Sequence, residues 1–198
     1  MTAIIQLRMR GSREDKAASH ERIVAIAATR IREAGTEQPG VAEIMKAAGL
    51  THGGFYKHFA SRDELIAEAV QRAMVDSEPR IAALVADSDS EDLLTAFIDV
   101  YLSEEHRDDP GSGCGVAALG ADIARLGADP QEAFRAQVDR YREQLQPLLA
   151  DGGDDGEARR RAIVTLCTMV GALTIARALG RTPDSDELLR DVREALRR

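Results

Sequence analysis

One stretch of this chain, Glu157 to Leu179, carries apolar residues on nearly every side of a helix and constrains the fold more than any other segment. A helix that is apolar on all faces has to be covered on all faces, by helices of the same chain or of a second chain. The longest run without an ionisable residue anywhere in the chain is shorter than the roughly 18 apolar residues that a membrane span needs. The stretch therefore predicts a helix packed against other helices.

Most of the remaining chain also repeats its apolar residues at helical spacing, and the alternating runs of a half-buried strand are absent. Gly35 and Gly49 stand where helices would end, Ser61 and Glu64 form a capping box that starts another, and Pro79 predicts a bend or break in it. We therefore expect an all-α fold of about nine helices, at residues 21–34, 41–48, 51–59, 62–85, 90–103, 114–126, 130–149, 157–179 and 186–196.

The sequence lacks the residue patterns of common enzymes and metal sites. Cys114 and Cys167 lie 53 positions apart with no C-x-x-C pair, so neither a disulfide scaffold nor a structural zinc site is expected. The four histidines are not spaced as metal ligands, and no nucleophile elbow, phosphate-binding loop or dinucleotide-binding glycine turn occurs. No apolar run follows Met1 as in a signal peptide. We expect a cytoplasmic, non-enzymatic protein without a metal, a cofactor or a membrane partner.

The net charge of −8 is unevenly distributed along the chain. Residues 1–60 carry nine Arg and Lys against six Asp and Glu, whereas the other 138 residues carry 17 against 28. No acidic residue lies between Glu43 and Asp63, so a polyanion can approach this window without meeting a carboxylate. The basic residues in or beside the window are Lys46, His52, Lys57, His58 and Arg62.

Residues 41–59, VAEIMKAAGLTHGGFYKHF, predict two short helices around a tight turn at Ala48-Gly49-Leu50. This is the arrangement of a helix-turn-helix. Gly49 supplies the backbone conformation that the turn requires. Ile44, Leu50 and Phe55 are expected to bury the inner faces, so that the second helix projects outward.

The projecting segment contains two consecutive glycines, Gly53 and Gly54, each about 1 kcal/mol less favourable than Ala inside a helix. Their presence indicates a gain elsewhere, because a helix without side chains there can bring its backbone close to another surface. Hydrogen-bond donors flank the pair and fit a duplex groove, where phosphate contacts position a protein and base edges give sequence preference. These donors are Thr51, His52, Tyr56, Lys57 and His58.

Residues 20–70 resemble the DNA-binding domain of the tetracycline-repressor (TetR) family of bacterial regulators. Several spaced matches over about a quarter of the chain make the resemblance specific. The matching motifs are Ala34-Gly35, Ala48-Gly49-Leu50, Phe55-Tyr56-Lys57-His58-Phe59 and Ser61-Arg62-Asp63-Glu64-Leu65.

The resemblance implies roles for individual residues. Thr51, His52 and Gly53 would face the bases. Tyr56 and His58 would face the phosphate backbone, and Arg62 would approach a phosphate at the start of the following helix. Lys46 and Lys57 complete the candidate DNA-binding set. For His58 alone, the alternative is that the ring caps or packs at the helix junction.

One departure from the family pattern concerns the start of the second helix. The family usually has Thr or Ser there, whereas this chain has Pro39-Gly40, which removes a hydroxyl cap and a phosphate contact. Either the loss of this contact lowers the affinity for DNA, or the basic arm from Arg8 to Lys16 compensates for it.

The resemblance also divides the chain into a DNA-binding domain at residues 17–62 and an effector-binding and dimerisation domain at residues 63–198. In this family the last two helices pair two chains, and segments 157–179 and 186–196 fit that role because a monomer would leave part of the first exposed. The alternative is that segment 157–179 is the central core helix of a monomer. The expected contact residues are Ile163, Cys167, Val170, Gly171, Thr174, Leu188 and Val192.

The C-terminal part of the family also holds an effector pocket. At Cys114 the start of a helix can lower the thiol pKa and permit redox sensing, while the other interpretation is a small residue at a tight helix entry. The candidate pocket residues are Phe97, Tyr101, His106, Cys114, Phe134, Tyr141, Leu166 and Met169.

The expected function is that of a homodimeric repressor that binds a palindromic operator and is released from it by an unidentified small molecule. The alternative is a helical adaptor or ligand-binding protein that dimerises through its last two helices and does not bind DNA. Steep salt dependence of DNA binding is expected only for the regulator.

Overall fold

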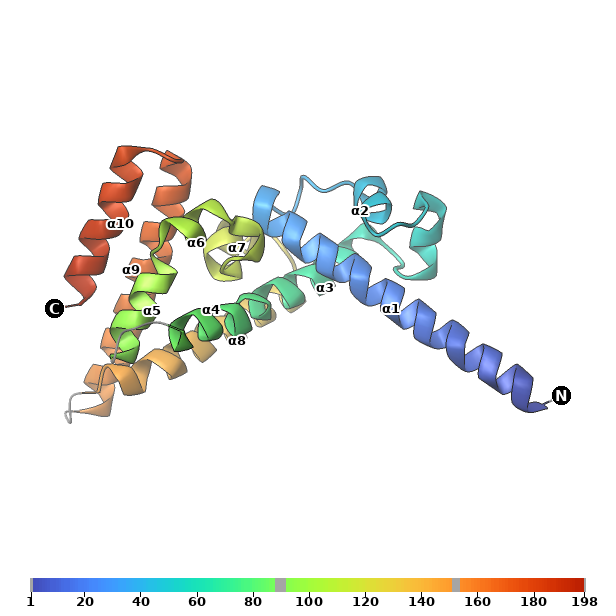
Figure 1. The fold of residues 1–198 in the computed structure, drawn as a ribbon, viewed down its shortest axis with the longest axis horizontal. Helices are drawn as coiled ribbons and strands as arrows, with labels where there is room; N and C mark the ends of the chain where they lie inside the picture. The colour runs from blue at the N-terminus through green and yellow to red at the C-terminus, as the bar shows by residue number, and fades with distance from the viewer. Residues whose placement is uncertain (1, 88–91, 151–153, 198) are drawn as a thin grey trace.

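The computed structural model describes residues 2–87, 92–150 and 154–197, with side chains from Arg13 onward, and over this part of the chain it is entirely helical without a strand (Figure 1). The all-α class is therefore confirmed. The elements are α1 (Thr2–Ala34), α2 (Val41–Ala47), the 3-10 helix η1 (His52–Lys57), α3 (Arg62–Val75), α4 (Ser77–Ala86), α5 (Leu93–Tyr101), α6 (Glu104–Asp108), the 3-10 helix η2 (Pro110–Ser112), α7 (Gly115–Ile123), α8 (Ala128–Leu148), α9 (Asp155–Leu179) and α10 (Pro183–Leu196).

The largest differences from the sequence prediction concern α1, the α3–α4 break and α6. The first helix begins at Thr2, so the basic arm belongs to a helix. The helix predicted for 62–85 is divided at Asp76, because Pro79 lacks an N–H and its ring clashes with the carbonyl one turn earlier. The short helix α6 forms within a stretch predicted to be a loop, where the Ser103 hydroxyl accepts a hydrogen bond from the His106 amide at 3.1 Å.

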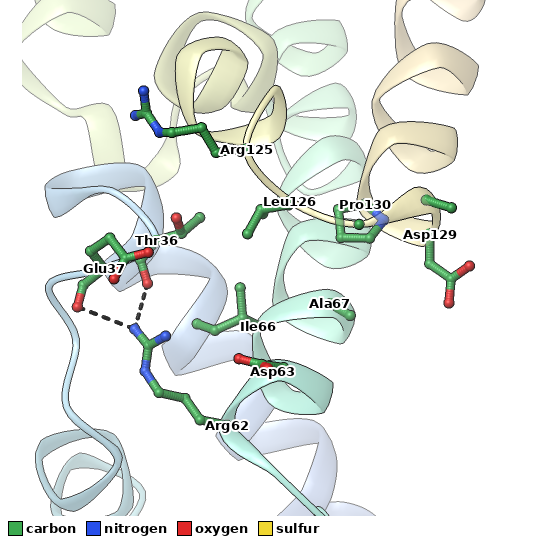
Figure 2. Close-up of a pocket in the computed structure, with 12 residues that line it drawn as sticks. Thr36, Glu37, Arg62, Asp63, Ile66, Ala67, Arg125, Leu126, Asp129 and Pro130 are labelled. Atoms are coloured by element: carbon green, nitrogen blue, oxygen red, sulfur yellow. Dashed lines mark hydrogen bonds between the residues drawn. The ribbon is translucent and has the colours of Figure 1, made fainter.

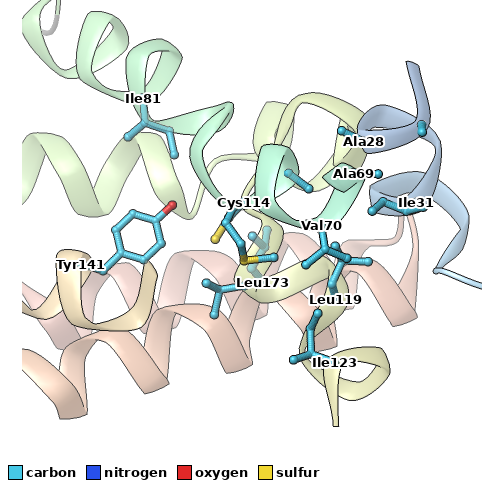
Figure 3. Packing of buried hydrophobic residues seen from close by; sticks show 14 of the residues in the cluster. Ala28, Ile31, Ala69, Val70, Ile81, Cys114, Leu119, Ile123, Tyr141 and Leu173 are labelled. Carbon is cyan, nitrogen blue, oxygen red and sulfur yellow. The ribbon is translucent and has the colours of Figure 1, made fainter. Parts of the chain in front are cut away.

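Helix α3 occupies the middle of the molecule. It packs against α1 on one side and against α8 and α7 on the other. Helix α9 packs against α8 and α10, at the end of the molecule opposite the N-terminus of α1 (Figure 1). One continuous apolar core follows this order from α1 to α9 and includes Ile31, Val70, Leu119 and Leu173 (Figure 3).

Helix α9 is covered on only part of its surface. Leu166, Met169 and Leu173 are buried, whereas Val164 and Ile175 on the opposite side are 62% and 51% exposed. By length and composition α9 is apolar enough to cross a membrane, and in this structure it packs against α8 and α10. The uncovered side fulfils the expectation that a single chain leaves part of this helix exposed.

Polar contacts of two residues, Arg32 and Thr36, fix the C-terminal end of α1 to the rest of the molecule. The buried Arg32 guanidinium donates to the Gly111 carbonyl at 2.7 Å and lies 3.4 Å from a carboxylate oxygen of Asp76. Burial lowers the pKa of Arg32, and the carboxylate opposes that shift. The Thr36 amide donates to Asp122 at 2.8 Å. Both α3, through Asp76, and α7, through Asp122, therefore contact the end of α1 and the loop that leads to α2.

Two glycines of α7 test this packing. A Cβ at Gly115 would lie 2.5 Å from the Ala73 carbonyl oxygen of α3, whereas one at Gly120 would meet the Phe134 ring at an ordinary 3.8 Å. We expect Gly115→Ala to lower the free energy of unfolding by about 1–3 kcal/mol. Gly120→Ala is expected to raise it by up to about 1 kcal/mol, because Ala favours a helix. Urea unfolding measures both; equal stability of the two variants would contradict the close α3–α7 approach.

Candidate nucleic-acid interface

The turn between α2 and η1 has the helix-turn-helix geometry that the sequence predicts. Gly49 has a positive φ of 74°, and the Leu50 amide donates to the Met45 carbonyl at 2.8 Å. Ile44 and Phe55 are buried, which anchors both elements from the inside. The first turn of α2 begins at Gly40 without a side-chain cap, as expected from Pro39-Gly40.

The projecting element is a 3-10 helix, not the α-helix expected for 51–59. Its hydrogen bonds include those from the Gly54 amide to the Thr51 carbonyl and from the His58 amide to the Phe55 carbonyl, both at 2.9 Å. Two adjacent glycines disfavour an α-helix, and short 3-10 turns are common where an α-helix is not sustained.

Six of the eight predicted DNA-binding residues lie on the surface of this region. The Tyr56 side chain is 73% exposed, and a Cβ on Gly53 would have no heavy atom within 4 Å. The stretch around Gly53 therefore faces outward and is not covered by neighbouring side chains. The six exposed residues are Lys46, Thr51, His52, Gly53, Tyr56 and Lys57.

Arg62 is directed elsewhere. Its guanidinium donates to the Thr36 carbonyl at 2.5 Å and to the Glu37 carbonyl at 3.2 Å, which holds the loop between α1 and α2 (Figure 2). The side chain lines a cleft of about 590 Å³ with Asp63 and Arg125, between this loop, α3 and the α7–α8 connection. In this arrangement Arg62 positions the helix-turn-helix, and the cleft does not include the six exposed residues.

His58 is half-buried at the junction of η1 and α1. Its Nδ1 atom is buried and has no hydrogen-bond partner in the described part of the chain. Burial lowers the pKa of His58, and the positive charges of His20, Lys16 and Lys57 lower it further. His58 therefore favours the neutral form in the free protein.

Two residues of α1, His20 and Arg22, also belong to this region. The sequence did not predict a role for either. The His20 ring stacks on Phe59 with centroids 4.6 Å apart, and its Nε2 lies 2.7 Å from a Glu68 oxygen of α3. The Arg22 guanidinium donates to the Ala48 carbonyl at 3.2 Å, at the end of α2. The helical spacing of His20 with the buried Ile23 of α1 was the signal that could have identified it.

The start of α3 forms the first half of the predicted capping box, and its reciprocal bond goes to the residue before the N-cap. The Ser61 hydroxyl accepts a hydrogen bond from the Glu64 amide at 3.1 Å, and the Glu64 carboxylate accepts one from the Ala60 amide. This pairing turns Glu64 toward the helix end. Among the described residues no three potential metal-ligating side chains come together.

Known proteins are similar to this chain both in the helix-turn-helix segment and over most of its length. Residues 23–69 match the family described as bacterial regulatory proteins, tetR family. The HTH-type transcriptional regulator Rv0196 of Mycobacterium tuberculosis is 29% identical over 184 residues, which cover 89% of this chain and 93% of that protein.

Solved structures share the fold over more than nine-tenths of the chain. A TetR transcriptional regulator from Chloroflexus aurantiacus superposes with a TM-score of 0.76 at 26% identity, over 93% of this chain and 97% of the other. A TetR-family regulator from Cytophaga hutchinsonii, at 16% identity, shares the fold with a TM-score of 0.74 over 92% and 94% of the two chains.

Residues 23–69 form a DNA-binding domain of the TetR type, and the chain as a whole is similar to TetR-family regulators. It is a DNA-binding transcriptional regulator and not an enzyme. The helix-turn-helix, with η1 as its outward element, lies within the residues that the tetR family model matches.

The open space at Gly53 yields a prediction. We expect Gly53→Ala to leave thermal stability unchanged, since an added Cβ meets no atom in the free protein. Its affinity for DNA should fall about tenfold, or about 1.4 kcal/mol, if the backbone there lies against a base pair. Gly54→Ala is the control, because its Cβ points inward and meets Met45 at 3.6 Å. Thermal unfolding and fluorescence anisotropy measure the two effects, and equal affinities of Gly53→Ala and wild type would exclude a close approach.

Proposed function

We propose that this protein is a homodimeric repressor that binds a palindromic operator and dissociates from it when a small apolar molecule binds its C-terminal part. The observation that carries the proposal is the outward η1 surface, which presents Tyr56 and Lys57 within a stretch free of acidic residues. A cytoplasmic location follows from a DNA partner.

The DNA-binding role is supported by charge and shape together. The chain as a whole is acidic, so attraction for phosphates is confined to its exposed basic segment. The backbone of η1 is accessible at Gly53, and the side chains that flank it, Thr51 and His52, are exposed donors. Such a surface can contact phosphates and base edges in one groove.

The proposed dimer surface is the uncovered side of α9. Val164, Gly171 and Ile175 follow each other at helical spacing, and no atom lies within 4 Å of a Cβ built on Gly171. Of the contact residues expected from the sequence, Cys167 and Thr174 are exposed, and the remaining ones are half-buried: Ile163, Val170, Gly171, Leu188 and Val192. A two-fold pair would place two η1 elements roughly 34–36 Å apart, one duplex turn.

The proposed effector site is an apolar cavity of about 370 Å³ between α4, α5 and α8. This volume lies in the range of pockets that hold small organic ligands. Phe97 and Tyr141, two of the residues expected from the sequence, line it together with Pro79 and Ile81 of α4.

The other expected pocket residues lie outside this cavity. Tyr101, Cys114, Leu166 and Met169 are buried in the core, and Phe134 is half-buried beside Gly120. His106 uses both ring nitrogens within the fold: Nε2 accepts from the Cys114 amide at 3.0 Å and Nδ1 donates to the Tyr101 carbonyl at 2.7 Å. Burial lowers the pKa of His106 to about 4, so the ring is neutral near pH 7.

The proposed coupling between the two sites runs through the α3–α4 pair. Helix α4 borders the cavity, and its neighbour α3 holds the helix-turn-helix against α1. A ligand that moves α4 acts on Asp76 at the break, and hence on Arg32 of α1. Ligand binding then changes the separation of the two η1 elements in the dimer.

Substitutions on η1 separate the two kinds of DNA contact. We expect Tyr56→Ala to weaken binding to all duplexes by a similar factor, because a phosphate contact carries no sequence information. Thr51→Ala or His52→Ala should change the preferred bases, at about 1–3 kcal/mol for the affected position. Affinities for an operator and its single mismatches, recovered by selection with the wild-type protein, measure both effects. Failure of the wild type to retain any duplex in this selection would favour the adaptor alternative.

The dimer proposal predicts the effect of a charge on α9. Ile175→Glu places an unpaired carboxylate in the contact twice, and we expect the dissociation constant of the dimer to rise at least about a hundredfold. Leu84→Glu on α4 is the matched control, since Leu84 is 41% exposed and lies outside the proposed contact. Sedimentation equilibrium measures the constant, and a dimer unaffected by Ile175→Glu would contradict this surface.

A further inference from the structure

The face of α1 that packs into the core continues beyond the core as a basic surface. Ile23, Ala27 and Ile31 are fully buried and recur at spacings of three or four residues. Steps of three or four residues from Ile23 toward the N-terminus lead through His20 to Lys16 and Arg13, which are exposed. One helix face therefore changes from apolar to basic where α1 leaves the body of the protein (Figure 1).

This basic surface lies next to the C-terminal end of η1. His20 lies between the apolar part and the basic part of this face of α1. Its ring stacks on Phe59, and its centroid lies 6.0 Å from that of His58. Lys16 lies one helical turn before His20 on the same face of α1, and is therefore next to the edge of η1 that His20 contacts.

Acidic side chains near this part of α1 do not neutralise it. Arg13 and Lys16 form no ion pair in the described part of the chain. Glu21 is paired with Arg72 at 3.1 Å, and Glu68 is occupied by His20. Glu14 and Asp15 do not share the face of Arg13 and Lys16 at helical spacing.

We propose that Arg13 and Lys16 bind the phosphates of duplex DNA beyond the base pairs contacted by η1, so that each half of the interface extends outward along α1. The inference rests on the proposed operator binding and adds a second DNA contact to it. The occupant is DNA because the basic face is continuous with the proposed DNA interface. These contacts replace the phosphate contact that the uncapped start of α2 at Gly40 cannot make.

The test compares two duplexes that contain the operator selected by the wild-type protein. One ends at the outer base pair of each half-site and the other carries ten further base pairs on each side. Affinities of wild type, Arg13→Ala and Lys16→Ala are measured by fluorescence anisotropy from 50 to 200 mM salt. Arg30→Ala is the matched control, because it removes one charge from the same helix at a residue paired with Glu33, at the end remote from His20.

On the long duplex, each α1 substitution removes two phosphate contacts per bound dimer. The slope of log affinity against log salt should fall by about 1.8. The advantage of wild type should then shrink roughly tenfold between 50 and 200 mM salt. On the short duplex the variants and wild type should have the same slope, and Arg30→Ala should match wild type on both.

Two results would overturn the inference in different ways. Wild-type slopes for Arg13→Ala and Lys16→Ala on the long duplex would exclude the contact and leave operator binding intact. Absence of binding by the wild type to any duplex would remove the proposed function together with the inference. Circular dichroism of each variant confirms that a changed slope does not come from loss of the fold.

Discussion

The packing of α1 against α3 is the contact on which the other features of this structure depend. The buried face of α1, with Ile23 and Ile31, and the buried residues of α3, with Leu65 and Val70, belong to one core that continues into α7, α8 and α9. Because α3 belongs to both halves of the molecule, the helix-turn-helix is held by the same helix that contacts the C-terminal bundle. The η1 surface and the cavity between α4, α5 and α8 are therefore connected through packed helices, without a flexible linker between them.

The sequence was sufficient for features that depend on local chemistry. The positive φ of Gly49, the capping box at Ser61 and the outward position of Tyr56 all follow from residue type and spacing, which tertiary contacts did not override. The 3-10 form of η1 was not predicted, because helical periodicity over six residues does not distinguish 3-10 from α geometry. The N-terminal extension of α1 was missed because residues 2–20 have no regular apolar face to indicate a helix.

Features that depend on contacts distant in sequence could not be predicted in the same way. The Arg62 guanidinium binds carbonyls 25 and 26 positions earlier in the chain, and nothing at Arg62 itself indicates that choice over a phosphate. His106 looked like a ligand-binding residue by type, yet both of its ring nitrogens are used by backbone groups. The apolar composition of α9 predicted that a single chain would leave part of this helix exposed. Only the packing of its other side shows that Val164 and Ile175 belong to the exposed part.

The proposed function requires that η1 enters the major groove as one half of a two-fold pair. Methylation interference at guanine N7 on a selected operator tests it most directly, since N7 lies in the major groove. We expect two patches of interference, related by two-fold symmetry, with centres 10–10.5 base pairs apart or a multiple of that spacing. A single patch, or binding that no N7 methylation affects, would contradict it.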